Sequence, residues 1–328
     1  MATQIVYRLT ARNSFRDIKP FKEPIPTIER HEVLVKIKAV SLNYRDIAIS
    51  NGSYPFPVKD SVVPCSDGAG EIVEVGAAVS RLHKGDYVIG NFDLSHQYGP
   101  QQDFNNGQGG PIDGVLREYA VLPAQSVTKI PKDTTLNFAQ MASLLQLTIS
   151  CKGTGGVSIT GLLIAKAAGA VTIVTSSSDE KLKIIKEKYS PDYVINYKKT
   201  PDWGAEAKKI TKGRGVDFIF ENGGSGTIKQ SLEAITFGGI VAVIGFLSPA
   251  TQEDMPDVAS LALAKGCVVR GILVGAKQYM DDLVTFVIQK GIQPPVHKVF
   301  GFSKDEVQSA FQYLNDGEHL GKVCIALE

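Results

Sequence analysis

From about Leu147 onward, short apolar runs alternate with stretches whose apolar residues recur at helical spacing. This alternation is typical of βαβ units, in which helices cover both faces of a parallel sheet. The predicted strands are LTISC, AVTIVTS, DYVINY, VDFIFE, IVAVIGF and CVVRGILV, and the helical stretches are VSITGLLIAKAAG, DEKLKIIKEKY, WGAEAKKITKG and TIKQSLEAI. The pattern predicts an α/β domain with a doubly wound parallel sheet.

The chain up to about residue 125 has a different sequence pattern. Its strand-like runs are short and bounded by Gly, Pro, Asn and Asp. It predicts a twisted, partly closed β-structure. The tail adds two helical segments and the strand KVCIALE, which we expect to return to this first domain. The polar, glycine-rich loop Ser95 to Gly114 is long enough to suggest a lid or a functional insertion.

Composition narrows the class of protein. The chain has 328 residues, 43% of them hydrophobic, which is enough for two domains with their own cores. Its 35 basic and 34 acidic residues leave a net charge of +1, so nucleic acid is not expected as the main partner. Cys65, Cys151, Cys267 and Cys324 form no C-x-x-C pair, which favours reduced thiols. With no membrane-length apolar run either, we expect a cytoplasmic protein without a membrane partner.

A glycine-rich loop follows the first predicted strand and opens a helical stretch. Glycines there let the backbone approach a pyrophosphate, whose charge meets the amides and dipole of the helix N-terminus. A plain turn is the alternative reading, but the βαβ units that follow favour dinucleotide binding. The predicted contacts are Gly153, Thr154, Gly155, Gly156, Val157 and Ser158, the last in place of the third glycine of the general pattern.

The end of the next strand bears on the choice of dinucleotide. An acidic side chain near this point usually holds the ribose of NAD, whereas here Ser176, Ser177 and Ser178 precede Lys181. Hydroxyl groups and a cation suit a 2′-phosphate, so NADP is favoured. The serines would also cap the helix. Asp179 leaves the NAD alternative open, since its carboxylate could reach a ribose.

These motifs together resemble the medium-chain dehydrogenase/reductase superfamily, in particular its zinc-independent quinone oxidoreductase-like and enoyl reductase-like branch. The motifs are SLNYRD, CSDGAGEIVEVG, KGDYVIG, DGVLREYAVLP, GTGGVS, SSSDEKL, YVINY, GRGVDFIFENGG, GGIVAVIGF and HLGKVCI, in an order that covers nearly the whole chain. The resemblance implies a GroES-like β-rich catalytic domain over residues 1–125 and 271–328. It implies a Rossmann dinucleotide-binding domain over residues 126–270.

The same resemblance predicts that no metal is bound. Zinc-dependent relatives have a cysteine where this chain has Asn43 or Tyr44, and a His-Glu pair where it has Ser66 and Asp67. They have a four-cysteine lobe where this chain has its polar loop. Tetrahedral zinc needs at least three Cys, His or carboxylate ligands together. A zinc alcohol dehydrogenase would therefore require bound zinc against this expectation.

The resemblance also implies roles for single residues. Asn43 would contact nicotinamide or substrate, and Tyr54 would point its phenol at the reacting oxygen, although a half-buried packing role is the alternative for Tyr54. Arg45 and Asp46 would pair structurally. The implied cofactor contacts are Ser176, Ser177 and Lys181 near the 2′-phosphate, Tyr197 at the adenosine end, Asn222 and Gly223 after the fourth strand, Gly245 and Phe246 beside the nicotinamide, and Lys322 near the chain end.

One departure from the family concerns the junction before the first strand. In relatives the element matching Met141 to Leu144 is followed by a helix that crosses the domain junction and by a proline-glycine turn. About two dozen residues of this kind do not fit before QLTISCKGTGG, since a helix rises about 1.5 Å per residue. The shortened junction would widen the site, leave the nicotinamide poorly held, or expose surface that another subunit covers.

Two functions remain open from the sequence. The first is an NADPH-dependent reductase of quinones, enones or related activated carbonyls that uses no metal. The second is a catalytically weak NADPH-binding protein with a sensing, scaffolding or complex-forming role, which the shortened junction favours. The strand Cys267 to Val274 resembles the edge through which relatives pair, so we expect a homodimer, with a covered monomer edge as the alternative.

Overall fold

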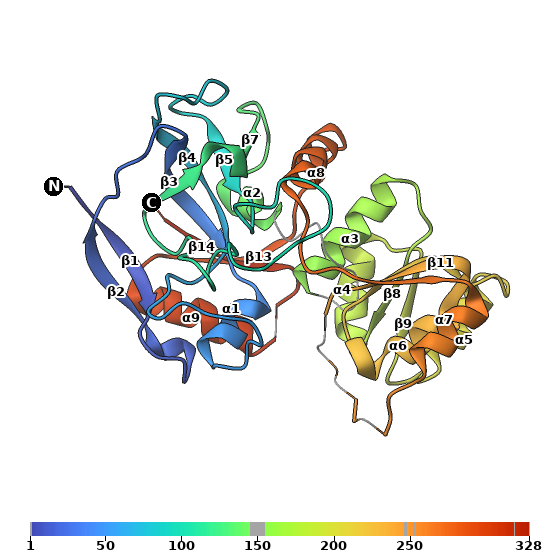
Figure 1. Cartoon of the computed structure of the whole chain (residues 1–328). Helices are drawn as coiled ribbons and strands as arrows, with labels where there is room; N and C mark the ends of the chain where they lie inside the picture. The colour runs from blue at the N-terminus through green and yellow to red at the C-terminus, as the bar shows by residue number, and fades with distance from the viewer. Residues whose placement is uncertain are drawn as a thin grey trace. The chain divides into compact units, whose positions relative to one another are not determined.

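The computed structural model describes residues 2–144, 155–245, 248, 250–251, 253–317 and 319–327. The chain divides into two compact units: unit 1 contains Met1–Thr148 and Val274–Glu328, and unit 2 contains Ile149–Leu273. Segments from both ends of the sequence, blue and red in Figure 1, therefore share unit 1. The tail, with its two predicted helical segments and the strand KVCIALE, lies in the same unit as the first domain.

Unit 1 is built on a sheet with the strand order β13-β14-β3-β4-β5-β7, in which β6 also pairs with β3. A separate antiparallel hairpin, β1-β2, precedes it in sequence. The strands are β1 (Thr3–Leu9), β2 (Ile18–Pro24), β3 (Glu32–Ser41), β4 (Asp67–Val75), β5 (Tyr87–Gly90), β6 (Tyr119–Pro123), β7 (Val127–Ile130), β13 (Val296–Phe300) and β14 (Lys322–Ala326).

Strand β3 lies inside this sheet, and its side chains alternate between core and surface. Val35, Ile37 and Ala39 are at most 2% exposed, whereas Lys36 and Lys38 between them are partly exposed. A period of two is the spacing at which one face of a strand is buried. The backbone of β3 pairs with β4, β6 and β14, so strands from three distant parts of the chain converge on it.

Unit 1 also contains helices. They are η1 (Phe15–Asp17), α1 (Tyr44–Ser50), η2 (Ala124–Ser126), α2 (Phe138–Ser143), α8 (Lys277–Gln289) and α9 (Lys304–Asn315). In α9 the residues Val307, Ala310, Phe311 and Leu314 are buried. They recur at i, i+3, i+4 and i+7, which places them on one face that packs on the core of unit 1.

Unit 1 takes in residues beyond the predicted boundary at 125, and unit 2 extends to Leu273. The difference has a physical cause. Strand β7 pairs antiparallel with β5 and so belongs to the sheet of unit 1. Helix α2 then packs on β3, β4 and β14. Both elements follow the predicted boundary in sequence but add to the first core.

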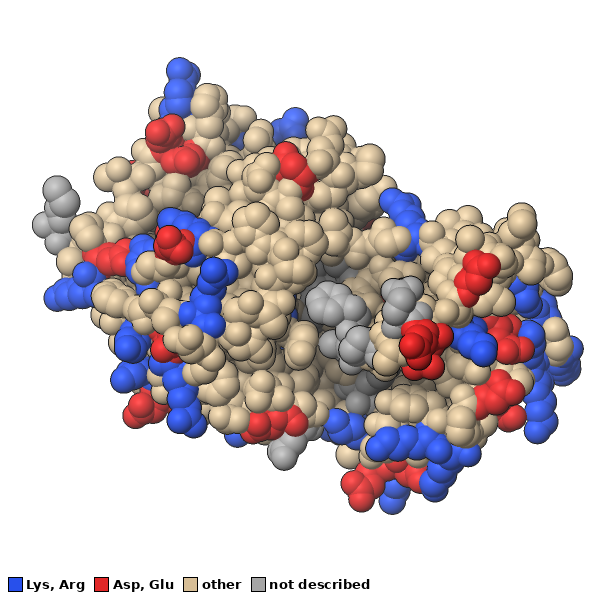
Figure 2. All heavy atoms as spheres, turned by 60° about the horizontal axis from the view of Figure 1, so that its bottom comes forward, with Lys and Arg blue, Asp and Glu red and all other residues tan. Residues whose placement is uncertain are grey.

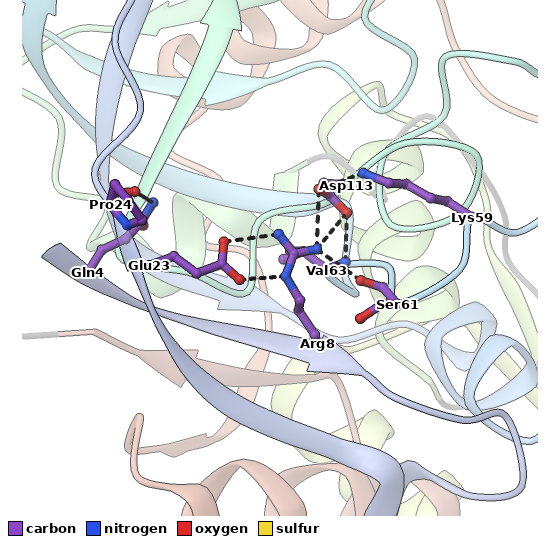
Figure 3. A network of polar contacts seen from close by, with 8 residues as sticks. All are labelled: Gln4, Arg8, Glu23, Pro24, Lys59, Ser61, Val63 and Asp113. Carbon is purple, nitrogen blue, oxygen red and sulfur yellow. Dashed lines mark hydrogen bonds and ion pairs between the residues drawn. The ribbon is translucent and has the colours of Figure 1, made fainter.

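The β1-β2 hairpin is attached to the rest of unit 1 by a network of charged side chains (Figure 3). Arg8 of β1 pairs with Glu23 of β2, and its Nη2 lies 3.0 Å from the carboxylate. Arg8 also donates to the carbonyl of Ser61 at 2.9 Å and lies 3.4 Å from Asp113. Lys59 donates to Asp113 at 2.8 Å. The hairpin is thereby joined to the segments before β4 and β6.

Unit 2 consists of parallel strands joined by helices, as the alternating pattern predicted. Its elements are α3 (Gly156–Ala167), β8 (Ile173–Ser176), α4 (Asp179–Tyr189), β9 (Tyr193–Asn196), α5 (Trp203–Ile210), β10 (Val216–Glu221), η4 (Gly224–Gly226), α6 (Ile228–Ala234), β11 (Ile235–Val243), α7 (Val258–Lys265) and β12 (Val268–Gly271). Strand β8 pairs with β9, and β11 pairs with β10 and β12, all in parallel. These pairings are those of an α/β fold of Rossmann type.

A shared core joins the two strand groups of unit 2. Trp203, the only tryptophan of the chain, is 7% exposed and packs with Ile195 of β9 in a cluster that also contains Ile173 of β8 and Ile219 of β10. Burying an aromatic side chain of this size contributes on the order of 2 to 3 kcal/mol. The predicted first strand and the shortened junction fall within residues 145–154, outside the described residues.

Three further observations bear on the class of protein. None of the helices within the described residues is long and apolar enough to span a bilayer. The face shown in Figure 2 carries basic and acidic side chains interspersed with one another. Cys65, Cys267 and Cys324 are free thiols, and Cys151 lies outside the described residues.

Candidate functional site

The first part of the site forms where the chain leaves β3 and enters α1. Asn43 adopts an extended backbone conformation before the helix, and its N–H donates to the Asp46 carboxylate at 2.8 Å. The Asp46 N–H donates back to the Asn43 carbonyl at 2.9 Å. This exchange fixes the start of a helix of only seven residues, which would be marginal on its own.

The Asn43 side chain enters a buried polar cluster. Its Oδ1 accepts a hydrogen bond from Lys322 Nζ at 2.7 Å, and its Nδ2 donates to Asp67 at 2.9 Å. Lys322 also donates to the Leu42 carbonyl at 2.8 Å, and Ser66 Oγ donates to Asp67 at 2.6 Å. Lys322 and Asp67 are 3% and 4% exposed, so these polar groups are paired with one another and away from solvent.

Burial sets the protonation behaviour of this cluster. Desolvation raises the pKa of Asp46 to about 6, against the opposing effect of the Arg45 charge and the Asn43 hydrogen bond. Desolvation lowers the pKa of Lys322, although the charge of Asp67 opposes it. The pKa of the Cys65 thiol is raised well above its usual value by burial and by the nearby Asp46 charge. Cys65 is therefore a buried, protonated thiol and a poor nucleophile.

Tyr54 is held by Arg45. Arg45 Nε donates to the Tyr54 phenol oxygen at 2.9 Å, and Arg45 Nη1 donates to the Gln108 carbonyl, also at 2.9 Å. The guanidinium carbon lies 4.9 Å from the Tyr54 ring centroid and 4.7 Å from that of Phe92. The expected pairing of Arg45 with Asp46 is replaced by these contacts, because the guanidinium turns toward Tyr54 and the loop backbone.

The polar loop from Ser95 to Gly114 is anchored in its middle and at its start. Aromatic contacts link Phe56, Phe104 and Phe92, with centroid distances of 4.9 and 5.5 Å. At the other side, the His96 carbonyl accepts from the Lys277 N–H at 2.9 Å, at the N-terminus of α8. That helix has no side-chain cap, so loop carbonyls satisfy its first amides.

In unit 2, the N-terminus of α3 offers the predicted pyrophosphate position. Gly155 is the N-cap, and no atom of the described residues lies within 4 Å of the place its Cβ would occupy, so these residues leave its backbone open to close approach. Gly156, Val157 and Ser158 form the first turn of the helix. Among the described residues, Ser158 Oγ is buried without a hydrogen-bond partner. Gly153 and Thr154 lie outside the described residues.

The carboxyl ends of β8 and β9 bring four of the predicted contacts together. The Tyr197 N–H donates to the Ser176 carbonyl at 3.0 Å, which places the two residues side by side. The Ser176 side chain is only 3% exposed and its Oγ accepts from the Ser178 N–H at 3.4 Å, so this hydroxyl serves the turn. Ser178 caps α4 by accepting from the Lys181 N–H at 3.2 Å. Ser177 remains partly exposed beside them.

Asp179 is the residue whose carboxylate could reach the ribose of NAD. In the structure this carboxylate is bound by two other side chains. Its carboxylate forms an ion pair with Lys199 and accepts from Asn196 Nδ2 at 2.6 Å. The hydrogen bonds from Lys199 and Asn196 lower the pKa of Asp179. Asp179 therefore stays ionised, with its charge directed toward β9 and the residues after it.

The carboxyl ends of β10 and β11 meet through two predicted glycines. A Cβ on Gly245 would lie 2.5 Å from the Asn222 carbonyl, and a Cβ on Gly223 would lie 2.1 Å from Thr227 Oγ1. Gly245 therefore lies against the backbone of Asn222, and Gly223 lies against the side chain of Thr227, so neither position has room for a larger residue. Phe246, the next predicted contact, lies outside the described residues.

A buried carboxylate that the sequence did not single out holds this loop. Glu221 is 0% exposed and accepts from the N–H of Gly223 at 2.7 Å and of Gly224 at 3.2 Å. It also accepts from Thr227 Oγ1 at 2.6 Å and from Ser231 Oγ. The sequence does contain a signal for this role. Glu221 ends a predicted strand and is followed by Asn222, Gly223 and Gly224.

The structure thus brings the predicted residues together in two groups, one in each unit. Asn43, Tyr54 and Lys322 lie in unit 1 with Asp46, Asp67 and Arg45. The described cofactor contacts lie at the N-terminus of α3 and at the carboxyl ends of parallel strands in unit 2, where α/β sheets bind nucleotides. Their open glycine backbone and helix amides fit a dinucleotide. Within the described residues, no group of three or more His, Cys, Asp or Glu side chains is placed to hold a metal ion.

Comparison with known proteins agrees with this arrangement. Residues 29–132 match the family of alcohol dehydrogenase GroES-like domains, and residues 156–289 match the family of zinc-binding dehydrogenases. A zinc-type alcohol dehydrogenase-like protein of Schizosaccharomyces pombe is 38% identical over 96% of this chain and 97% of its own length. A probable quinone oxidoreductase of Leishmania amazonensis is 25% identical over 94% of this chain and 95% of its own.

Among solved structures, an alcohol dehydrogenase from Sinorhizobium meliloti superimposes with a TM-score of 0.87 and 33% identity, covering 99% of both chains. The GroES-like unit and the Rossmann-type unit together define an oxidoreductase of the nicotinamide-dependent kind. The chain belongs to the medium-chain dehydrogenase/reductase superfamily.

Proposed function

We propose that this chain is a reductase that transfers a hydride from NADPH to a quinone, an enone or a related activated carbonyl, without a metal ion. The observation that carries the proposal is the contact between Arg45 and Tyr54. Because the phenol oxygen of Tyr54 accepts from Arg45 Nε at 2.9 Å, its own hydrogen is left for another acceptor. A positioned donor of this kind is what a substrate oxygen needs as it gains negative charge.

The proposed reaction balances with one hydride and one proton per substrate. NADPH, which the N-terminus of α3 and the strand ends of unit 2 would hold, would supply the hydride and leave as NADP⁺. Tyr54 gives its phenol proton to the substrate oxygen and recovers one from solvent. Arg45 stabilises the phenolate in the interval, since its charge stays within hydrogen-bond distance of the oxygen. Asn43 adds a second hydrogen-bond donor.

Metal independence is supported by the charge already present in unit 1. The Lys322 ammonium lies 2.7 Å from Asn43 Oδ1. Asn43 is one of the two positions at which zinc-dependent relatives would have a cysteine ligand. A zinc ion beside Asn43 and Asp67 would be repelled by this buried cation. The ammonium also offsets the charge of Asp67, which is the electrostatic task that a metal would perform there.

The preference for NADPH is supported by the first turn of α4. Ser177, Ser178 and Lys181 lie at a helix N-terminus, where amides and dipole favour an anion. Asp179, the carboxylate that would repel a 2′-phosphate, is paired with Lys199. The local balance of charge therefore favours the phosphorylated cofactor.

The test is a titration of the purified chain with NADPH and, separately, NADH, followed by nicotinamide fluorescence. 9,10-Phenanthrenequinone or a simple enone is then added to the same cuvette. We expect tighter binding of NADPH and its oxidation after addition. Tight binding with no oxidation of any quinone, enone or aldehyde would instead establish the catalytically weak NADPH-binding protein.

Two controls sharpen the result. The substitution Lys181→Ala should weaken NADPH binding roughly tenfold and leave NADH binding unchanged, because a phosphate contact contributes about 1 to 2 kcal/mol. Lys183→Ala, on an exposed position of the same helix, should change neither. Metal analysis of the active protein should find less than stoichiometric zinc, and activity should survive a chelator. Stoichiometric zinc whose removal abolishes turnover would overturn the metal-free mechanism.

A further inference from the structure

The amide of Asn43 lies between a group that can only donate and a group that accepts. Lys322 Nζ lies 2.7 Å from Asn43 Oδ1, and an ammonium has no lone pair. Asp67 Oδ2 lies 2.9 Å from Asn43 Nδ2, and a carboxylate has no hydrogen to give. If the amide turned over, its NH₂ would face the ammonium and its oxygen would face the carboxylate. Both hydrogen bonds would then become repulsive contacts.

The strand register brings these three residues together. Ser41, the last residue of β3, is paired with Cys324 of β14 on one side and with Asp67 of β4 on the other. Lys322 is the first residue of β14 and Asp67 the first of β4, so both side chains flank the point where the chain leaves β3 toward Asn43. Three adjacent strands therefore place the cation and the carboxylate on opposite sides of one amide.

Burial makes this arrangement rigid. Lys322 and Asp67 are 3% and 4% exposed, and each has a second anchor, the Leu42 carbonyl for Lys322 and the Ser66 hydroxyl for Asp67. Asn43 itself is only partly buried. One of its two amide hydrogens is used by Asp67, and the other has no hydrogen-bond partner within the part of the chain that the structure describes. The amide can therefore present a hydrogen-bond donor to a ligand, but not its oxygen.

We propose that Lys322 and Asp67 are positioning residues that lock the Asn43 amide, so that its remaining N–H is offered as a donor to a carbonyl oxygen. This inference rests on the proposed reductase function and deepens it. The carbonyl oxygen belongs either to the substrate or to the carboxamide of the nicotinamide, which share this chemistry. Lys322 thus acts through Asn43, whereas the sequence had suggested a direct contact with the cofactor.

The first test reads the Asn43 amide without turnover. The protein is labelled with ¹⁵N-asparagine, and the Asn43 side-chain NH₂ signals are assigned by their loss in Asn43→Ala. In Lys322→Met we expect these signals to shift and their exchange with solvent to accelerate at least about tenfold, because the oxygen has lost its partner. Lys19→Met, the same change at an exposed lysine of β2, should leave them in place.

Loss of a buried cation can itself prevent folding. A second variant at Lys322 therefore makes the test possible even if Lys322→Met does not fold. Lys322→Gln retains an N–H donor without the charge. We expect an Asn43 signal between those of the wild type and Lys322→Met. If the Asn43 signals and their exchange are the same in wild type and in both Lys322 variants, the lock does not exist.

The second test is a double-mutant cycle on quinone reduction. In the presence of Asn43, Lys322→Met should lower kcat roughly tenfold, while in the Asn43→Ala background it should lower it less than about twofold. Equal losses in both backgrounds would overturn the proposal, since Lys322 would then act independently of Asn43. A loss confined to NADPH affinity assigns the N–H to the carboxamide, and a loss in kcat alone assigns it to the substrate. A wild type without turnover would refute the reductase and leave the amide test standing.

Discussion

Asp46 shows how a single buried carboxyl couples the site to stability. It accepts the Asn43 N–H through Oδ2, while its Oδ1 is buried without a hydrogen-bond partner among the described residues. Burial raises its pKa to about 6 in the folded chain, above the ordinary 3.8 of the unfolded one. A raised pKa contributes stability that is fully present below about pH 4 and is lost as the pH rises through about 6.

Asp46→Asn should therefore change stability in a pH-dependent way. The amide keeps an acceptor for the Asn43 N–H but is never ionised. Relative to the wild type, the variant should gain on the order of 2 kcal/mol in unfolding free energy between about pH 4 and pH 7.5, since one pKa unit corresponds to about 1.4 kcal/mol. Urea unfolding at both pH values measures this. An equal difference at the two pH values, as expected for the exposed control Asp60→Asn, would contradict it.

Tyr54 carries the proposed proton transfer, and its hydroxyl can be removed without removing its ring. In Tyr54→Phe the ring contacts with Arg45 and Phe56 remain, while the donor is lost. We expect kcat for quinone reduction to fall roughly 10- to 100-fold with NADPH affinity unchanged. The matched control is Tyr44→Phe, at a tyrosine that is 56% exposed. Similar rates in both variants would assign Tyr54 the packing role instead.

The sequence identified Asn43, Tyr54 and Lys322 but not how they are connected. Lys322 and Asn43 are 279 positions apart, and only the pairing of β14 with β3 brings them into contact. Arg45 was expected to pair with its neighbour, whereas its long side chain reaches Tyr54 and the Gln108 carbonyl. Such contacts depend on tertiary structure. A sequence motif can therefore identify a functional residue without identifying the residue that it contacts. The Asn-x-x-Asp spacing before α1 was the one local signal for Asp46.

At the scale of elements, the loop after β10 depends on Glu221. Its carboxylate accepts two backbone N–H groups and two hydroxyls. Three of these donors share Oε1 and the fourth, Ser231 Oγ, donates to Oε2, so the NH₂ of Glu221→Gln would face at least one donor. We expect a loss on the order of 1 to 3 kcal/mol in the unfolding free energy of unit 2. Nucleotide affinity should fall as well, because Gly223 lies in this loop.

Thermal unfolding and nucleotide titration of Glu221→Gln would check both effects. The matched control is Glu187→Gln, at an exposed position of α4, which should change neither. A variant as stable as the control but weaker in nucleotide binding would mean that Glu221 contacts the ligand itself and is not a support of the loop.

Elements with strong periodicity were predicted closely and short ones were not. The stretch DEKLKIIKEKY coincides with α4, and VDFIFE coincides with β10, since each has a clear period and a local start signal. Helices α1 and α2, of seven and six residues, were not predicted as helices. So few residues show no helical period in the sequence. In the structure α2 packs on β3, β4 and β14, and α1 packs on α9. Hydrogen bonds at Asn43 and Asn137 fix where the two helices begin.

At the scale of the whole molecule, the change of sequence pattern indicated two units. It did not indicate at which residue the first unit ends. The strand β7 and the helix α2 follow the predicted boundary at residue 125, yet both pack on the first sheet. Which sheet a strand joins is decided by its pairing partner far away in sequence. The shortened junction falls in residues 145–154, outside the described residues, so its effect on activity rests on the NADPH titration.

The expected homodimer is a prediction for the whole molecule, and its structural basis is the edge strand β12. Among the described strands, β12 pairs only with β11, and its Val268 is 50% exposed. Leu273, just beyond it, is 53% exposed. An unpaired strand edge with apolar side chains is a template for pairing with a second copy. We therefore expect the purified chain to have twice the mass of the monomer in solution.

Val268→Lys tests this edge, because a charge on an edge strand opposes pairing with another chain. Light scattering after size exclusion should show a dimer for the wild type and a monomer, or at least a roughly tenfold weaker dimer, for the variant. The matched control is Val299→Lys in β13, also an edge strand, where the valine is 47% exposed. It should leave the dimer intact. A monomeric wild type would assign β12 to a covered monomer edge, and dissociation by Val299→Lys alone would move the interface to unit 1.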